Sequence, residues 1–473
     1  MLQLPQAIWR DCVVYFLSKV EDLARLDSAA ANRSDQATFH ENIRGCKRFT
    51  RCKLKIRDCS QIKWLVLRDI FITNMEFNGD PKPEQKSYIQ HLLLHVKNIQ
   101  FSKLTLSHDN NLLHWTFSSN LLDVSLKSCT FDDISGLSVC SGLTDLTIFD
   151  CPNITDESFV VGIAGCAQLT RCFVLGCASL SEIALVALLQ SCVELNYVLL
   201  NGRFDLEKVF TMFQSVSNVK IFNCSDSSRT LSLTGSAIRA MATALPCLGW
   251  INVDYQHSTV GDADIEVLVH ECKLLTSIDL CRWPLVTDLG VLALARALKQ
   301  LLALDVQNLG ITDAAVQAVG THCRQLEDLN VSGCQLLTDN AFSTLNASSL
   351  KTLQITATRV TGSFAVYLLG SESTLEMLYC YKGEQLSSDF ARSITGAARL
   401  TSLILGKVLF AEADWLELST KCPALLVLRI EKSTSVTDAV ALSFSDHCPR
   451  LRYISLWGCS VSPEVMNLLQ TKQ

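Results

Sequence analysis

The chain has 473 residues, of which 48% are hydrophobic and 19% are charged, and its formal net charge is −6. That length and hydrophobic content can build an extensive buried core, whereas the small negative charge argues against a protein that binds nucleic acid or an acidic membrane surface. The first residues show no basic segment followed by an apolar core, and the sequence has no apolar run of about 18 residues, so we expect neither a secretory signal nor a membrane span.

Residues 1–45 show helical spacing but lack the pattern that fills the rest of the chain. A proline near the start favours a helix soon after it, and apolar residues then recur at intervals of three and four. These residues are Leu4, Pro5, Ile8, Trp9, Phe16, Leu17, Leu23 and Leu26. The spacing predicts a short helical module.

Residues 46–120 contain degenerate copies of a pattern that becomes regular later. Ile62, Leu65 and Leu67 stand at offsets of three and two, as in the later copies. Residues 79–86 form a polar, proline-containing break, which predicts a surface loop.

Residues 121–473 repeat one unit. Leu275, Ile278 and Leu280 are followed by Thr287-Asp288, and similar copies start about 25 residues apart. The three apolar residues fit a short strand, and the Thr-Asp pair precedes an apolar run with helical spacing, where Thr or Asp can accept from the first N–H groups of a helix. The unit is therefore strand, turn and helix, and only stacked copies can bury its apolar face.

The cysteines follow the same repeat. The chain has 21 of them, an odd number. One group follows the strand: Cys129, Cys151, Cys177, Cys224, Cys334 and Cys459. A second group precedes the next strand by three residues: Cys140, Cys166, Cys192, Cys272, Cys323, Cys422 and Cys448. We interpret both groups as small, reduced, buried fillers, because a metal site needs a closer pairing of Cys or His.

The repeats, with Cys334 before Thr338-Asp339, resemble the cysteine-containing leucine-rich repeats of F-box receptors. The resemblance implies an α/β leucine-rich-repeat solenoid, a horseshoe with parallel strands on the concave face and helices on the convex face. Residues 121–473 would form the array, and residues 46–120 its degenerate first repeats.

Residues 1–45 resemble an F-box, the module that docks a receptor onto a Skp-family adaptor in cullin ubiquitin ligases. The resemblance implies that the eight residues from Leu4 to Leu26 named above bind the adaptor. Residues Ala29 to Arg33 depart from the family, which carries a valine-cysteine and a tryptophan in this half. The alternative is a helical cap that only shields the first repeat.

The residues between buried strand positions would point into the concave face. We expect a protein substrate to bind there, through Phe149, Phe173, Tyr197, Phe222, Trp250, Asp254, Asp279, Asp305, Asp328, Tyr379, Tyr381, Tyr453 and Trp457. Two alternatives stay open: the aromatic side chains can pack sideways as a ladder, and the stacked carboxylates can be solvated rather than await a basic partner. A metal on these four carboxylates is a weaker option.

We find no phosphate-binding loop, dinucleotide fingerprint, nucleophile elbow or zinc-protease motif, so we expect no enzyme and no cofactor. The expected function is substrate recognition in a cullin-type (SCF-like) ubiquitin ligase, by a protein in the cytoplasm or, as an open alternative, the nucleus. The rival is a leucine-rich-repeat scaffold without a ligase, for example axonemal or signalling.

Overall fold

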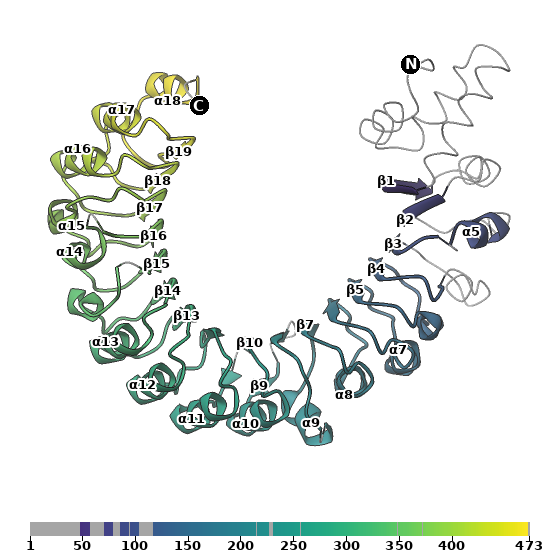
Figure 1. Ribbon diagram of the computed structural model, residues 1–473. Helices are drawn as coiled ribbons and strands as arrows, with labels where there is room; N and C mark the ends of the chain where they lie inside the picture. The colour runs from purple at the N-terminus through teal and green to yellow at the C-terminus, as the bar shows by residue number, and fades with distance from the viewer. Residues whose placement is uncertain are drawn as a thin grey trace, which may run out of the picture. The chain divides into compact units, whose positions relative to one another are not determined.

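The computed structural model describes residues 48–56, 71–78, 86–93, 95–103, 117–213, 215–226, 230–255, 257–347, 349–370 and 372–471. The chain divides into two compact units, Met1–Arg229 (unit 1) and Thr230–Gln473 (unit 2). Each unit is a stack of strand–turn–helix repeats, with the strands on one side and the helices on the other (Figure 1). The predicted helical module of residues 1–45, with its eight adaptor-binding residues, lies outside the described residues.

Unit 1 forms a parallel sheet in chain order. Its strands are β1 (Arg48–Ile56), β2 (Phe71–Asn78), β3 (Asn98–Ser102), β4 (Asp123–Lys127), β5 (Asp145–Phe149), β6 (Arg171–Leu175), β7 (Tyr197–Gly202) and β8 (Ile221–Asp226). Its helices are α5 (Lys86–Leu93), the 3-10 helix η2 (Ser135–Val139), α7 (Asp156–Ile163), α8 (Glu182–Ser191) and α9 (Leu206–Met212).

Unit 2 repeats the arrangement. Its strands are β10 (Trp250–Asp254), β12 (Ser277–Asp279), β13 (Ala303–Asp305), β14 (Asp328–Asn330), β15 (Thr352–Gln354), β16 (Met377–Cys380), β17 (Ser402–Gly406), β18 (Val427–Glu431) and β19 (Tyr453–Ser455), with a separate parallel pair β9 (Ser232–Leu233) and β11 (His257–Ser258). Its helices are α10 (Gly235–Ala244), α11 (Asp262–Glu271), α12 (Asp288–Ala297), α13 (Asp313–His322), η3 (Asp339–Phe342), α14 (Ala365–Leu368), α15 (Ser388–Ser393), α16 (Glu412–Lys421), α17 (Asp438–His447) and α18 (Pro463–Thr471). The sequence Ser462-Pro463-Glu464 predicts a helix start, and α18 begins there.

The repeated apolar residues are the core. Leu275, Ile278 and Leu280 are buried, and Ile278 lies in register with Leu304 of the next strand. Because side chains alternate along a strand, the residues between them point to the opposite face. The predicted skeleton is therefore confirmed in this repeat.

One copy of the skeleton was misplaced. The spacing suggests a strand pattern starting at Val216, but Val216 is exposed and the buried positions are Val219, Phe222 and Cys224. The pattern is shifted by three residues, so Phe222 points into the core, in register with Val198, instead of onto the binding face. The polar residues 223–230 also predict a protruding loop, and this prediction is wrong at its start, because β8 continues to Asp226.

The Thr and Asp residues of the Thr-Asp pairs have different roles: the threonine caps its own helix, and the aspartate binds the next repeat. Thr287 caps its own helix, because its Oγ1 accepts from the N–H of Leu289. Asp288 accepts from the N–H of Thr312 at 2.7 Å and from its Oγ1 at 2.5 Å, in the following repeat. Asp262 binds Thr287 and Asp313 binds Thr338 in the same way. Thr287, Thr312 and Thr338 thus cap their own helices, and the aspartate of the preceding repeat binds each of these threonines, which ties neighbouring repeats together.

The cysteines from Cys129 to Cys459 are free thiols, as predicted. The second group does more than fill space: the Sγ of Cys272 donates to the carbonyl of Leu245 at 3.4 Å, and Cys448 donates to Cys422 at 3.3 Å. Burial raises the pKa of Cys272 to about 12, so this thiol stays protonated and unreactive. These cysteines link a helix end to the helix end of the preceding repeat.

Candidate functional site on the strand face of unit 2

The strand face of unit 2 consists of the side chains between the buried strand positions, and they form three rows across the strands. The first row is Trp250, Ser277, Ala303, Asp328, Thr352, Met377, Ser402, Val427 and Tyr453. The middle row is Asn252, Asp279, Asp305, Asn330, Gln354, Tyr379, Ile404, Arg429 and Ser455. The third row lies two residues further along each strand and includes Asp254, Cys281, Tyr381, Gly406, Glu431 and Trp457.

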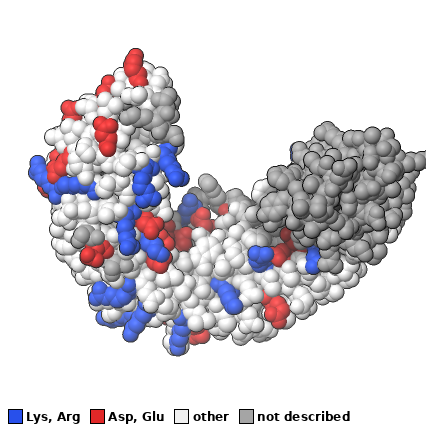
Figure 2. Space-filling model, turned by 45° about the horizontal axis from the view of Figure 1, so that its top comes forward, with Lys and Arg blue, Asp and Glu red and all other residues white. Residues whose placement is uncertain are grey.

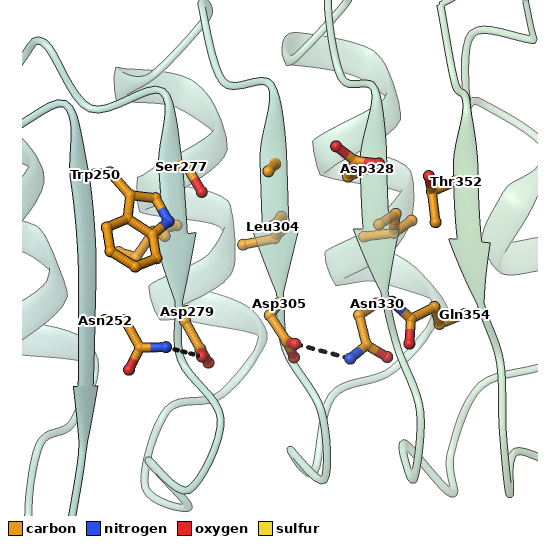
Figure 3. Close-up of a pocket in the computed structure, with 13 residues that line it drawn as sticks. Trp250, Asn252, Ser277, Asp279, Leu304, Asp305, Asp328, Asn330, Thr352 and Gln354 are labelled. Carbon is orange, nitrogen blue, oxygen red and sulfur yellow. Dashed lines mark hydrogen bonds between the residues drawn. The ribbon is translucent and has the colours of Figure 1, made fainter. Parts of the chain in front are cut away.

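A hollow of about 240 Å³ lies on this face between β10 and β15. Trp250 and Asp328 line its first-row side, and Asp279 and Asp305 line its middle-row side (Figure 3). Ala303 of the first row also lines it. The hollow therefore offers an aromatic wall, a small apolar side chain and two carboxylates.

The two central carboxylates are held by amides. Asp279 and Asp305 lie in register on neighbouring strands. Asn252 Nδ2 donates to Asp279 Oδ2 at 2.8 Å, and Asn330 Nδ2 donates to Asp305 Oδ2 at 2.7 Å (Figure 3). The backbone N–H of Cys281 donates to Asp279 Oδ1. These bonds orient both carboxylates but supply no positive charge.

The pKa values reflect this arrangement. The pKa of Asp279 is raised to about 6, mainly by burial and in part by the charges of Asp305 and Asp254, against the lowering effects of the Cys281 N–H and the charge of Arg282. Burial also raises the pKa of Asp305, against hydrogen bonds from Gln307 and Asn330. A nearby cation would reverse these shifts, because it stabilises the charged form.

The other two predicted carboxylates do not join this pair. Asp254 lies in the third row, where Arg282 Nη1 pairs with its Oδ1 at 3.2 Å. Asp328 lies in the first row, in register with Ala303. The expectation of four stacked carboxylates is therefore corrected to one adjacent pair, because residues two apart on a strand occupy different rows. Within the described residues, no group of three or more His, Cys, Asp or Glu side chains is placed to hold a metal ion.

The strands β16–β19 carry a different surface. Tyr453 is 52% exposed and Trp457 is 59% exposed, with Lys432 Nζ 4.7 Å from the centre of the Trp457 ring. Glu431 is only 3% exposed and accepts hydrogen bonds from Tyr381 Oη and Arg429 Nε. Figure 2 shows acidic and basic side chains close together over unit 2.

Tyr379 and Tyr381 both lie on the strand face, as predicted, and Tyr381 is 40% exposed. Gly406 lies between Tyr381 and Glu431 in the third row, and a Cβ there would come within 2.2 Å of the Tyr381 carbonyl oxygen. Only glycine fits, so the strands approach closely enough for Tyr381 to reach across to Glu431.

In unit 1, three of the four predicted aromatic residues lie on the strand face. Phe149 is exposed at the end of β5, and the half-buried rings of Phe173 and Tyr197 lie 5.1 Å apart. This contact is the sideways aromatic packing that the sequence left open. Phe222 is buried, as described above, and is removed from the candidate binding residues.

Sequence reasoning missed Gln354 and Ile404 as members of the middle row. Both occupy the position between two buried apolar residues, so the strand pattern contains the signal. Neither residue is charged or aromatic, so residue type alone does not mark them as binding residues.

Comparisons with known proteins agree with this architecture. No family model matches the chain. A leucine-rich-repeat protein of Leptospira interrogans matches with a TM-score of 0.50 and 13% identity, over 85% of this chain and 93% of that chain. A chain of the yeast Rad7–Elc1 complex matches with a TM-score of 0.49 and 16% identity, over 81% and 90%. A Listeria monocytogenes internalin matches with a TM-score of 0.40 and 14% identity, over 92% and 93%.

The likeness to the Leptospira protein, together with the parallel strands and the repeat, establishes the fold. The chain is an α/β leucine-rich-repeat solenoid. Among the described residues, no helix is both long and apolar enough to cross a membrane.

Proposed function

We propose that this chain is the substrate-recognition subunit of a cullin-type ubiquitin ligase. Residues 1–45 would bind a Skp-family adaptor, which the resemblance of Leu4-Pro5, Ile8-Trp9 and Phe16-Leu17 to an F-box supports. The strand face would hold a protein substrate. The receptor acts by proximity, because it raises the local concentration of substrate lysines near a ubiquitin-charged enzyme.

The observation that carries the binding role is the exposure of large aromatic side chains beside charged ones on the strand face. Tyr381, Tyr453 and Trp457 are each at least 40% exposed. Aromatic residues supply much contact area for little lost conformational freedom and are enriched at protein interfaces. Strands in register hold them in fixed positions, so little ordering is needed on binding.

The acid pair supports a substrate with a basic residue. Asp279 and Asp305 repel each other, and no cationic side chain of the described residues forms an ion pair with them. A lysine or arginine in the hollow would relieve that repulsion, and the Trp250 ring would offer a face to the cation.

The adaptor role is tested with the intact chain. Affinity purification from cells should recover a Skp-family adaptor and a cullin, and the triple variant Leu4→Ala, Pro5→Ala and Trp9→Ala should lose both. Arg296→Ala on the outer helix α12 is the control and should change nothing. Adaptor recovery that is unchanged in the triple variant, or absent from the wild type, contradicts the ligase role.

The alternative is a scaffold with the same strand face and no ligase. The departure from the F-box pattern at Ala29–Arg33 favours it, because these residues then need only cap the first repeat. The same purification separates the two functions: a scaffold recovers partners that depend on the strand face and neither adaptor nor cullin.

A further inference from the structure

The middle row carries carboxylates on β12 and β13 and a guanidinium on β18. Asp305 on β13 and Arg429 on β18 belong to one continuous register, through Asn330, Gln354, Tyr379 and Ile404. A path along this row therefore passes from carboxylates, over two amides and two apolar side chains, to a guanidinium.

We propose that the middle row binds one extended protein segment that places a basic residue at Asp279 and Asp305 and an acidic residue at Arg429. The inference rests on the proposed binding of a protein to the strand face and adds which chemistry the segment carries and at what spacing.

The acidic end is shaped for a long cationic side chain. The hollow places the Trp250 ring and the small Ala303 side chain beside the two carboxylates. An apolar stem can lie against Trp250 and over Ala303 while its charged head reaches the oxygens of Asp279 and Asp305, as Lys and Arg side chains do elsewhere. The two carboxylates, the aromatic wall and the small apolar side chain thus suit the same kind of group.

At the basic end, the buried Glu431 orients the side chain of Arg429. Arg429 directs Nε and Nη2 to the buried Glu431, and its side chain is 46% exposed. A guanidinium has five N–H donors, so donors remain for an incoming carboxylate. Lys432, in the turn after β18, adds positive charge near this end, where its charge acts on Glu431.

Strand spacing sets the length of the segment. Five steps separate β13 from β18, and neighbouring strands lie about 4.8 Å apart, so the two ends are about 24 Å apart. An extended chain advances about 3.3 Å per residue, which corresponds to about seven residues.

The middle of the path sets the residues in between. The amides of Asn330 and Gln354 can bond to backbone or polar groups, whereas Tyr379 and Ile404 offer apolar surface next to the basic end. The expected segment runs from a basic residue through polar positions to an apolar residue that precedes the acidic one.

A display library of random 12-residue peptides, selected on the immobilised full-length chain, tests this. Selected peptides should be several-fold enriched in Lys or Arg separated by six to eight residues from Asp or Glu. The variant Asp279→Asn/Asp305→Asn should remove only the basic preference. The variant Arg429→Gln/Glu431→Gln, which removes the cation together with its buried partner, should remove only the acidic one.

The control is Glu266→Gln/Arg296→Gln on the outer helices α11 and α12, which should select the same peptides as the wild type. Thermal melting checks that each variant is folded. Charge pairs at random spacing, or one preference surviving both strand-face variants, overturn the single-segment inference. If those results occur but Asp279→Asn/Asp305→Asn still removes a basic preference, the proposed binding of a protein to the strand face stands and only the single-segment inference fails. No enrichment over the bare matrix, or changes only in the helix control, overturn both.

Discussion

Two stretches of one strand face treat their carboxylates in opposite ways. On β12 and β13, Asp279 and Asp305 lie side by side with amide partners and no cation. On β18, Glu431 is almost fully buried, and it accepts hydrogen bonds from Tyr381 and Arg429. Both stretches share the same strand geometry, so the difference comes from the side chains that reach each carboxylate: Arg429 on the same strand as Glu431, and Tyr381 from the end of β16.

The pKa shifts follow from that difference. Burial and like charge raise the pKa of Asp279 to about 6. Burial also favours the protonated form of Glu431, but the hydrogen bonds from Tyr381 and Arg429 outweigh it and lower the pKa. A carboxylate satisfied by its own chain supports the fold, whereas a carboxylate pair without a cation costs stability and is available to a partner.

The largest effect is expected at Arg429. Arg429→Ala leaves Glu431 buried without its cation and should lower the free energy of unfolding by about 2 kcal/mol, less than for a fully buried pair because Arg429 is half exposed. Chemical denaturation at pH 7 measures the loss. Arg429→Ala/Glu431→Gln should recover part of it; a double variant less stable than the single one contradicts the account.

Removing the charge of Asp279 should raise the free energy of unfolding, in contrast to the loss expected at Arg429. Asp279→Asn removes the repelling charge and should stabilise the chain by about 1 kcal/mol at pH 7. The folded pKa of about 6 lies above the unfolded value of 3.8, so the contribution of Asp279 is fully present below pH 4 and is lost as pH rises through 6.

The gain from Asp279→Asn should therefore vanish at pH 4. Unfolding measured at pH 4 and pH 7 checks the sign, with Glu266→Gln on α11 as a control that shows no such change. A gain of equal size at both pH values means that the charge of Asp279 is not its cause.

The sequence predicts the fold well and the site only in part. The repeated spacing of three and two places Leu275, Ile278 and Leu280 in the core, and the period of two within the strand places Asp279 on the face, and the structure agrees. The spacing fails near Val216, because Val216 and Val219 both fit an apolar start and only the register of Phe222 with Val198 decides between them.

Relations between strands are what the sequence does not contain. Asp254, Asp279, Asp305 and Asp328 follow one another in the chain at similar spacing, but register separates them into three rows. The burial of Glu431 likewise depends on Tyr381, 50 residues earlier, and on the small Gly406 between them.

Register also predicts which carboxylates are coupled. In a double-mutant cycle, Asp279→Asn and Asp305→Asn should each relieve the same repulsion, so their gains should fall short of additivity by about 0.5 kcal/mol. Asp279→Asn and Asp328→Asn should be additive, because Asp328 lies in another row. Equal coupling in both pairs would mean that the acids act as one cluster.

The smallest effect is expected at Arg282, at the edge of the acid pair. Its guanidinium binds Asp254 Oδ1 at 3.2 Å, and its charge lowers the pKa of Asp279. Arg282→Gln removes that charge and exposes Asp279 to the unshielded charge of Asp254, so both changes raise the pKa of Asp279.

The stability that protonated Asp279 contributes should then be lost at a pH that is higher by a fraction of a unit. Measuring the free energy of unfolding between pH 4.5 and pH 8 would show this shift. Arg282→Lys keeps the positive charge, and its residue must adopt the same left-handed backbone conformation as Arg282. It should therefore leave the pH of this stability loss unchanged. A downward shift would mean that Arg282 acts on Asp279 through backbone geometry and not through its charge.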